Sequence, residues 1–227
     1  LAIADYDDDI NLVGGGDSHP PPYDWRVFDD PELYVVRQYW DDWFTIYNAL
    51  LRWDTSPLAV KSITGAELAI HITNLIDIDG YALRGEYYTP TTWPAGGPDY
   101  TGAGGNNAIA GIPLSELEDG TVNVIPLDNV ENINKSGYTV LRLTLTGEDS
   151  TPTNVNQVRF ASFEHASLPA PVLIVTYEDA VQQRASSDAG ALTVSEAPTI
   201  TAALTGSADI GPLAVTERSR VRELYKV

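Results

Sequence analysis

Length, composition and charge set the first limits on this chain of 227 residues. Hydrophobic residues make up 43% of it, with 5 Trp and 12 Tyr, which is enough apolar material for a sizeable core and argues against disorder. The formal net charge is -19, from 32 acidic and 13 basic residues, and such a surface repels phosphate. Composition therefore predicts a folded protein that does not bind nucleic acid.

The residue types that are missing exclude further classes of protein. There is no cysteine, which rules out disulfides, thiolate nucleophiles and zinc–thiolate sites. No apolar run reaches the roughly 18 residues of a membrane span, so we expect no membrane insertion. The sequence begins at Leu1, contains no Met and lacks a signal-peptide pattern, so we expect that a leader was removed or that the sequence is incomplete.

Residues 1–32 open the chain with the composition of an extended arm. They contain four aspartates before residue 10, the run Gly14-Gly15-Gly16 and a run of three prolines. Glycine raises backbone entropy and a proline run stiffens without internal hydrogen bonds, so neither favours a packed element. We expect an acidic, Gly/Pro-rich N-terminal arm here.

From residue 33 the hydrophobic pattern has the period of two that is typical of half-buried strands. In residues 66–73, Leu68, Ile70 and Ile72 alternate with polar side chains, and residues 139–145 alternate in the same way. Six less regular candidates are residues 33–39, 44–53, 81–88, 121–127, 157–163 and 172–177. Only residues 112–117 indicate a helical turn. The sequence predicts an all-β, jelly-roll-like β-sandwich of about eight strands over residues 33–178, with extended N- and C-terminal arms.

Residues 179–227 form a third region, in which apolar residues become small and sparse. Residues 191–196 recur in weakly similar form as residues 212–217, 21 positions later. Short strand-like segments of this kind gain stability by adding to the edge of another sheet. We expect a C-terminal arm that serves assembly, with a linker as the alternative. The basic residues after position 217 are interpreted as a solvated tail.

No set of residues forms a recognisable catalytic constellation. The three histidines share no metal-ligand spacing, and Ser162 lies inside an alternating strand and not on a sharp turn. Adjacent carboxylates such as Asp41-Asp42 are expected by chance among 32 acidic residues. We therefore expect a protein without enzymatic activity and without a cofactor.

Calcium is the one ion that the sequence leaves open. The segment Asp77-Ile78-Asp79-Gly80 resembles the start of a calcium loop, with Asp77 and Asp79 as candidate ligands. It lacks the spaced glutamate that would complete such a loop. Asp and Gly are also ordinary turn residues, and we favour the turn interpretation.

Aromatic residues supply the remaining signal of a binding surface. One group lies between residues 39 and 53, and a second comprises Tyr87, Tyr88, Trp93 and Tyr100. Exposed rings stack on sugars or anchor protein partners, whereas buried rings fill a core. We predict that Trp93, in a loop with two prolines, is exposed, and that the three tyrosines beside it are further candidate glycan contacts.

Several spaced segments resemble one known family. The string NALLRWDTS at residues 48–56, followed by ITGAEL, resembles the opening strands of DNRLRE-type domains. The similar segments are residues 48–56, 63–68, 133–139, 158–164 and 171–177. They occur in the family's order and cover residues 33–178. The chain departs from the family at Trp53, where the family usually has Phe.

The resemblance implies a jelly-roll sandwich related to carbohydrate-binding modules, as found in secreted surface proteins and in structural proteins of tailed viruses. It supplies no catalytic and no specific ligand residues. Our leading hypothesis is a virion structural protein, a decoration, collar (turret) or tail-associated subunit, which forms homo-oligomers, contacts other virion proteins and attaches to host-surface glycans. The alternative is an extracellular carbohydrate-binding module without catalytic activity. Either hypothesis places the chain on a virion or outside the cell.

Overall fold

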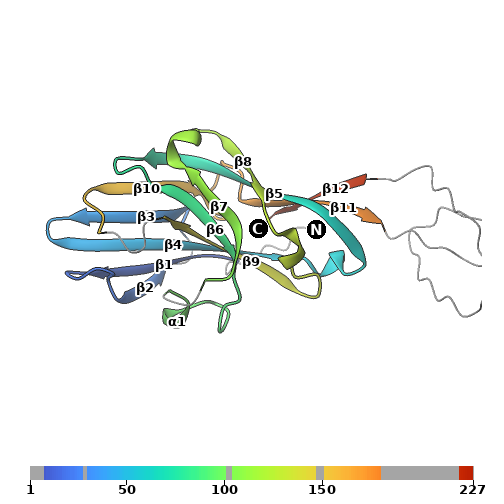
Figure 1. Ribbon diagram of the computed structural model, residues 1–227, viewed down its shortest axis with the longest axis horizontal. Coiled ribbons are helices and arrows are strands. Elements are labelled where there is room, and N and C mark those ends of the chain that lie inside the picture. Colours follow the sequence, from blue (N-terminus) through green and yellow to red (C-terminus); the bar gives the residue numbers. More distant parts are fainter. Residues whose placement is uncertain (1–7, 28–29, 101–103, 147–150, 180–219, 227) are drawn as a thin grey trace, which may run out of the picture.

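A computed structural model describes residues 8–27, 30–100, 104–146, 151–179 and 220–226, and they form an all-β fold (Figure 1). The strands are β1 (Asp9–Gly16), β2 (Tyr23–Val27), β3 (Glu32–Trp40), β4 (Trp43–Asp54), β5 (Lys61–Ile76), β6 (Ala82–Tyr87), β7 (Asn106–Pro113), β8 (Val122–Leu127), β9 (Tyr138–Leu145), β10 (Val155–Ala161), β11 (Val172–Asp179) and β12 (Arg220–Lys226). The helical elements are α1 (Gly97–Tyr100) and the 3-10 turns η1 (Ser56–Leu58), η2 (Leu114–Glu116) and η3 (Val130–Asn132). No helix in the described ranges is long and apolar enough to cross a membrane.

The strands pair in the order β12-β11-β5-β10-β3-β4-β9-β6-β7, with β8 added at β5 and the β1–β2 pair added at β4. The long strand β5 belongs to both halves of the sandwich. It pairs with β11 and β8 up to His71 and with β10 from Ile72 onward. Inward side chains of β3 to β11, among them Trp53, Leu68 and Phe160, meet in one main core. The predicted jelly-roll-like sandwich is confirmed.

β4 is the strand at which the sheet branches. β1 pairs with residues 44–51 of β4, β3 pairs with residues 43–47, and β9 pairs with residues 49–54. A strand has only two edges, so β3 and β9 follow one another along the edge opposite β1. Arg37 is buried and its Nε donates to the Leu145 carbonyl at 3.1 Å, which ties β3 to β9.

A second apolar cluster lies on the other face of the β1–β4–β9 region. Its buried strand residues are Ile10 and Leu12 of β1, Ile46 and Leu50 of β4, and Val140 of β9. The segment from residue 88 to residue 100 covers them, and Figure 1 shows α1 at this edge of the molecule. β4 and β9 therefore bury side chains on both faces, which the alternating pattern alone did not reveal.

Residues 9–27 do not form the extended arm that the sequence predicted. All eight residues of β1 are buried, and in Figure 1 β1 and β2 lie beside β4 as part of the sheet. The glycine run serves close packing: a Cβ at Gly14 would overlap the Tyr100 hydroxyl, and one at Gly15 would lie 3.1 Å from the Trp43 indole nitrogen. Glycine was read as a source of flexibility, but here it makes room for aromatic rings.

The eight predicted strands are confirmed as β3, β4, β5, β6, β8, β9, β10 and β11, and η2 lies within the predicted helical turn. Besides β1 and β2, the prediction missed β7 and β12. β12 pairs with β11 and falls within the predicted C-terminal arm. The weak repeat at residues 191–196 and 212–217 lies outside the described residues.

We expect Gly14→Ala to destabilise the protein by about 1–3 kcal/mol, because the added methyl group overpacks the second cluster against Tyr100. Gly96→Ala is the matched control, since a Cβ there meets nothing within 4 Å. Urea unfolding measures both. Equal midpoints for the two variants would contradict this account of the glycine run.

The start of β1 carries a buried acidic pair. Asp9 is 3% exposed and its Oδ2 accepts the Phe163 N–H at 2.8 Å, while both carboxylate oxygens of Glu164 are also buried. Burial raises the pKa of Asp9 from 3.8 to about 7 against the opposing Phe163 hydrogen bond, and repulsion from Glu164 and Asp8 adds to the rise. The Asp9 carboxyl group is therefore protonated in the folded state below neutral pH.

A pKa that is raised on folding means that the folded state binds the proton more tightly than the unfolded chain. The contribution of Asp9 to stability is therefore fully present below pH 3.8 and is lost as the pH rises toward about 7. We expect Asp9→Asn to be more stable than the parent protein at about pH 8, by on the order of 2–4 kcal/mol, and to differ little at about pH 4. Urea unfolding at both pH values tests this, with the exposed Glu116→Gln as control. A pH-independent difference between the variant and the parent would sink the idea.

Candidate functional site

The structure places all four predicted glycan contacts against the apolar clusters. Tyr87 and Tyr100 are each 7% exposed and belong to the main and second clusters, respectively. Trp93 packs on the second cluster, and the Arg52 guanidinium lies 4.4 Å from its ring centroid. Trp93 and Tyr100 therefore hold the covering segment over β1 and β4. Because Tyr87 and Tyr100 are buried, neither ring can stack on a sugar at the surface.

Tyr88, the fourth predicted contact, belongs to a network of buried charges. Arg142 is 5% exposed and donates to Glu86 at 2.8 Å, and its guanidinium lies 4.4 Å from the Tyr88 ring. The Tyr88 hydroxyl donates to Asp99 at 3.1 Å. Burial alone would raise the pKa of Asp99, but hydrogen bonds from two loop N–H groups and Tyr88 outweigh it and lower that pKa. The network fixes the covering segment on the sheet.

Asp77 and Asp79, the candidate calcium ligands, hold the loop between β5 and β6. The Asp77 carboxylate accepts two N–H groups of the turn, at 3.0 and 3.2 Å. Asp79 accepts donors from Thr153, Asn154 and Asn156; desolvation opposes them, yet they bring the pKa of Asp79 down to about 2. Both carboxylates face donors, whereas calcium needs a shell of oxygen ligands. Among the described residues, no group of three or more His, Cys, Asp or Glu could hold a metal.

Ser162 and His165 bind the backbone and not each other's side chain. The Ser162 hydroxyl donates to the Asp30 carbonyl at 2.5 Å, and His165 Nδ1 accepts the N–H groups of Ser167 and Leu168. Both side chains therefore stabilise the turn that follows β10.

Exposed tryptophans gather elsewhere, on one face of the β2-β1-β4-β3 part of the sheet, near its hairpin end. Trp40 and Trp43 are 72% and 50% exposed and are cross-strand partners in the β3–β4 hairpin. Val13 of β1 pairs with both Trp25 and Tyr47, and Tyr47 lies four residues after Trp43 on β4. Side chains alternate along a strand and cross-strand partners share a face, so Trp25, which is 45% exposed, projects from the same face. We call Trp25, Trp40 and Trp43 the tryptophan face.

The tight turn between β3 and β4 presents two of these three tryptophans. Its residues Asp41 and Asp42 have φ values of 53° and 62°, the left-handed conformation of a two-residue hairpin turn. On the opposite face Tyr39 stacks on Phe44 with centroids 4.7 Å apart, and its hydroxyl donates to Asp42 at 2.6 Å. These contacts hold the hairpin end in one conformation, so the exposed rings are presented on a rigid support.

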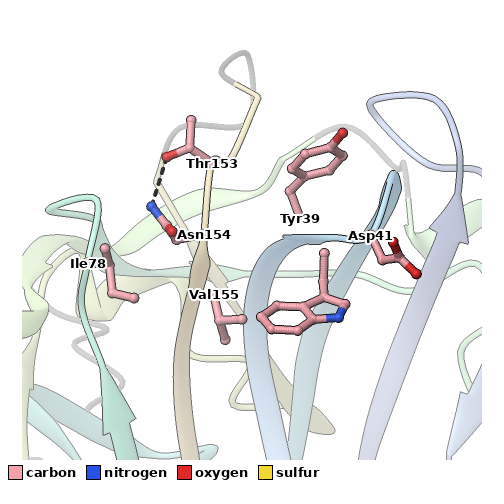
Figure 2. A pocket seen from close by; sticks show the side chains of 7 residues that line it. Tyr39, Asp41, Ile78, Thr153, Asn154 and Val155 are labelled. Atoms are coloured by element: carbon pink, nitrogen blue, oxygen red, sulfur yellow. Dashed lines mark hydrogen bonds between the residues drawn. The ribbon is translucent and has the colours of Figure 1, made fainter.

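A groove of about 480 Å³ opens beside Trp40 (Figure 2). It is lined by Tyr39, Trp40, Asp41, Ile78, Thr153, Asn154 and Val155. Figure 2 shows Ile78, Thr153 and Asn154 along one side, with the Asn154 amide donating to the Thr153 hydroxyl at 3.1 Å, and Asp41 on the other side. Apolar rings next to a carboxylate, a hydroxyl and an amide are the mixture that orients small polar ligands.

No protein-family model matches the chain, and no curated protein matches it in sequence. The resemblance to DNRLRE-type domains therefore stays a prediction.

The sequence itself carries a signal for this site. Trp40-Asp41-Asp42-Trp43 places two tryptophans around a two-residue polar turn, where the predicted strands of residues 33–39 and 44–53 meet. A hairpin brings the two residues that flank its turn onto one face of the sheet. That pattern points to exposed rings more directly than the proline-rich loop around Trp93 does.

Proposed function

We propose that this chain is a non-catalytic glycan-binding module whose ligand lies on the tryptophan face. The exposure of Trp40 beside the groove carries the proposal, because a ring that is 72% exposed has its flat surface free to stack on a sugar. A cluster of exposed apolar side chains on an otherwise acidic surface is a common mark of an interaction site.

The shape and stiffness of the site support a sugar ligand. The rings project from paired strands, so few side chains and little backbone need to be ordered on binding. The groove adds hydroxyl, amide and carboxylate groups that can bond to sugar hydroxyls. A ligand that covers the rings and reaches into the groove uses both kinds of surface.

The setting that we propose follows from the resemblance to DNRLRE-type domains. The chain would be a structural protein of a virion, in a decoration, collar or tail-associated position, which uses the tryptophan face for attachment to a host surface. An extracellular carbohydrate-binding module is the alternative, and it would use the same face.

The pairing of β12 with β11 favours assembly as a second role. β12 covers the outer edge of β11 over seven residue pairs, from Val172–Lys226 to Glu178–Arg220. A turn of about two residues suffices to join antiparallel neighbours, yet residues 180–219 separate these strands. A connection of that length allows β12 to pair with β11 of its own chain or of a second copy, and exchange between copies would form a homo-oligomer.

We expect Trp40→Ala to weaken glycan binding about tenfold, since the loss of one stacked ring removes roughly 1–1.5 kcal/mol. A glycan array identifies ligands, and titration calorimetry then compares the variants. Tyr138→Ala is the matched control: Tyr138 is 45% exposed and is the β9 partner of Asp54, at the end of β4 far from the hairpin. Binding that is absent from the whole array, or is lost equally in both variants, would refute the proposal.

For the assembly role, we expect removal of residues 220–227 to convert an oligomer into a folded monomer, because the edge of β11 loses its partner strand. Light scattering gives the mass, and circular dichroism reports whether the sandwich is intact. A full-length chain that is monomeric, or a truncated chain that assembles like the parent, would contradict strand exchange.

A further inference from the structure

The carboxylates around the groove differ in their hydrogen-bond donors. Asp42 accepts the Tyr39 hydroxyl at 2.6 Å, and Asp79 accepts Asn154 and two neighbouring side chains from the other side. Asp41 lines the groove itself and is exposed. It is therefore the carboxylate that a ligand in the groove would meet.

The lining has no positive charge to balance an acidic ligand. All seven residues that form the groove are described, and none of them is Lys, Arg or His. A sugar that carries a carboxylate or sulfate would face Asp41 without a counter-charge, and the net charge of -19 adds to the repulsion. A cation is attracted by the carboxylate and by the overall field.

The exposed ring of Trp40 favours the same sign of charge. The face of an indole ring attracts ammonium groups more strongly than the other aromatic rings do. Trp40 and Asp41 are adjacent in the chain and line one groove, so a single ligand can contact both.

We propose that the groove binds amino sugars: the sugar ring stacks on Trp40, and its protonated amino group pairs with the Asp41 carboxylate. This rests on the proposed glycan-binding function and names the class of glycan. Neutral sugars bind through the ring alone and more weakly, and acidic sugars are rejected.

Three oligosaccharides of equal length test this by titration calorimetry at low salt: a glucosamine oligomer, its N-acetylated form and a uronate oligomer. We expect the glucosamine oligomer to bind about tenfold tighter than the acetylated one, with a preference that shrinks as salt is added. The uronate oligomer should show no saturable binding.

Asp41→Asn identifies the carboxylate that is responsible. Asparagine keeps the shape and tolerates the φ of 53°, so the hairpin should be retained. We expect this variant to bind the glucosamine oligomer about tenfold more weakly and the acetylated one as before. Asp119→Asn removes the same charge from an exposed turn and should leave both affinities unchanged.

The outcomes separate this inference from the function on which it rests. If Asp41→Asn and Asp119→Asn weaken binding equally, the general field and not the groove selects the ligand, and the inference is wrong. If the three oligomers bind equally through Trp40, the inference fails but the glycan-binding function stands. If none of them, and no other glycan, binds, the proposed function fails first.

Discussion

The pairing of β1 with β4 is the interaction on which the rest of the structure depends. β1 supplies Ile10 and Leu12 to the second cluster, and burial of two such side chains contributes about 1.5–3 kcal/mol each. Asp8 anchors the start of the pairing: its carboxylate binds the Arg52 guanidinium, and its carbonyl accepts the Arg52 N–H at 2.8 Å. Arg52 lies 4.4 Å from the Trp93 ring, so the same side chain also contacts the segment that covers the cluster. Arg52 of β4 therefore connects the residue before β1 with the segment that covers the second cluster.

The pairing of β1 and β3 with β4 also explains why the candidate binding surface lies at the end of the β3–β4 hairpin. With β1 along one edge of β4 and β3 along the other, the hairpin end is supported on both sides as far as Phe44. The two faces of the hairpin end carry different aromatic residues. Tyr39 and Phe44 pack against each other on one face, while Trp40 and Trp43 project from the other. The buried Arg142–Glu86 ion pair holds the Tyr88 ring in the covering segment.

How much of this could be read from the sequence differs from element to element. The alternation of Leu68, Ile70 and Ile72 predicted a half-buried strand correctly, because one face of β5 meets the core and the other meets solvent. Gly14-Gly15-Gly16 was misread, because a glycine run has the same composition whether it frees the backbone or admits a ring at close range. The burial of Tyr87 and Tyr100 depends on a second core that forms only when β1 and the covering segment meet β4, and no local pattern encodes such a contact.

The central claim is that the tryptophan face, and no other aromatic surface, binds the ligand. The five tryptophans of the chain allow a direct test by nuclear magnetic resonance, since each indole N–H gives its own signal. During titration with a glycan, the account predicts that the signals of Trp40 and Trp43 shift in a saturable way and that Trp53, buried in the main core, does not respond. A response confined to Trp93, or a shift of the same size in every indole, would contradict it.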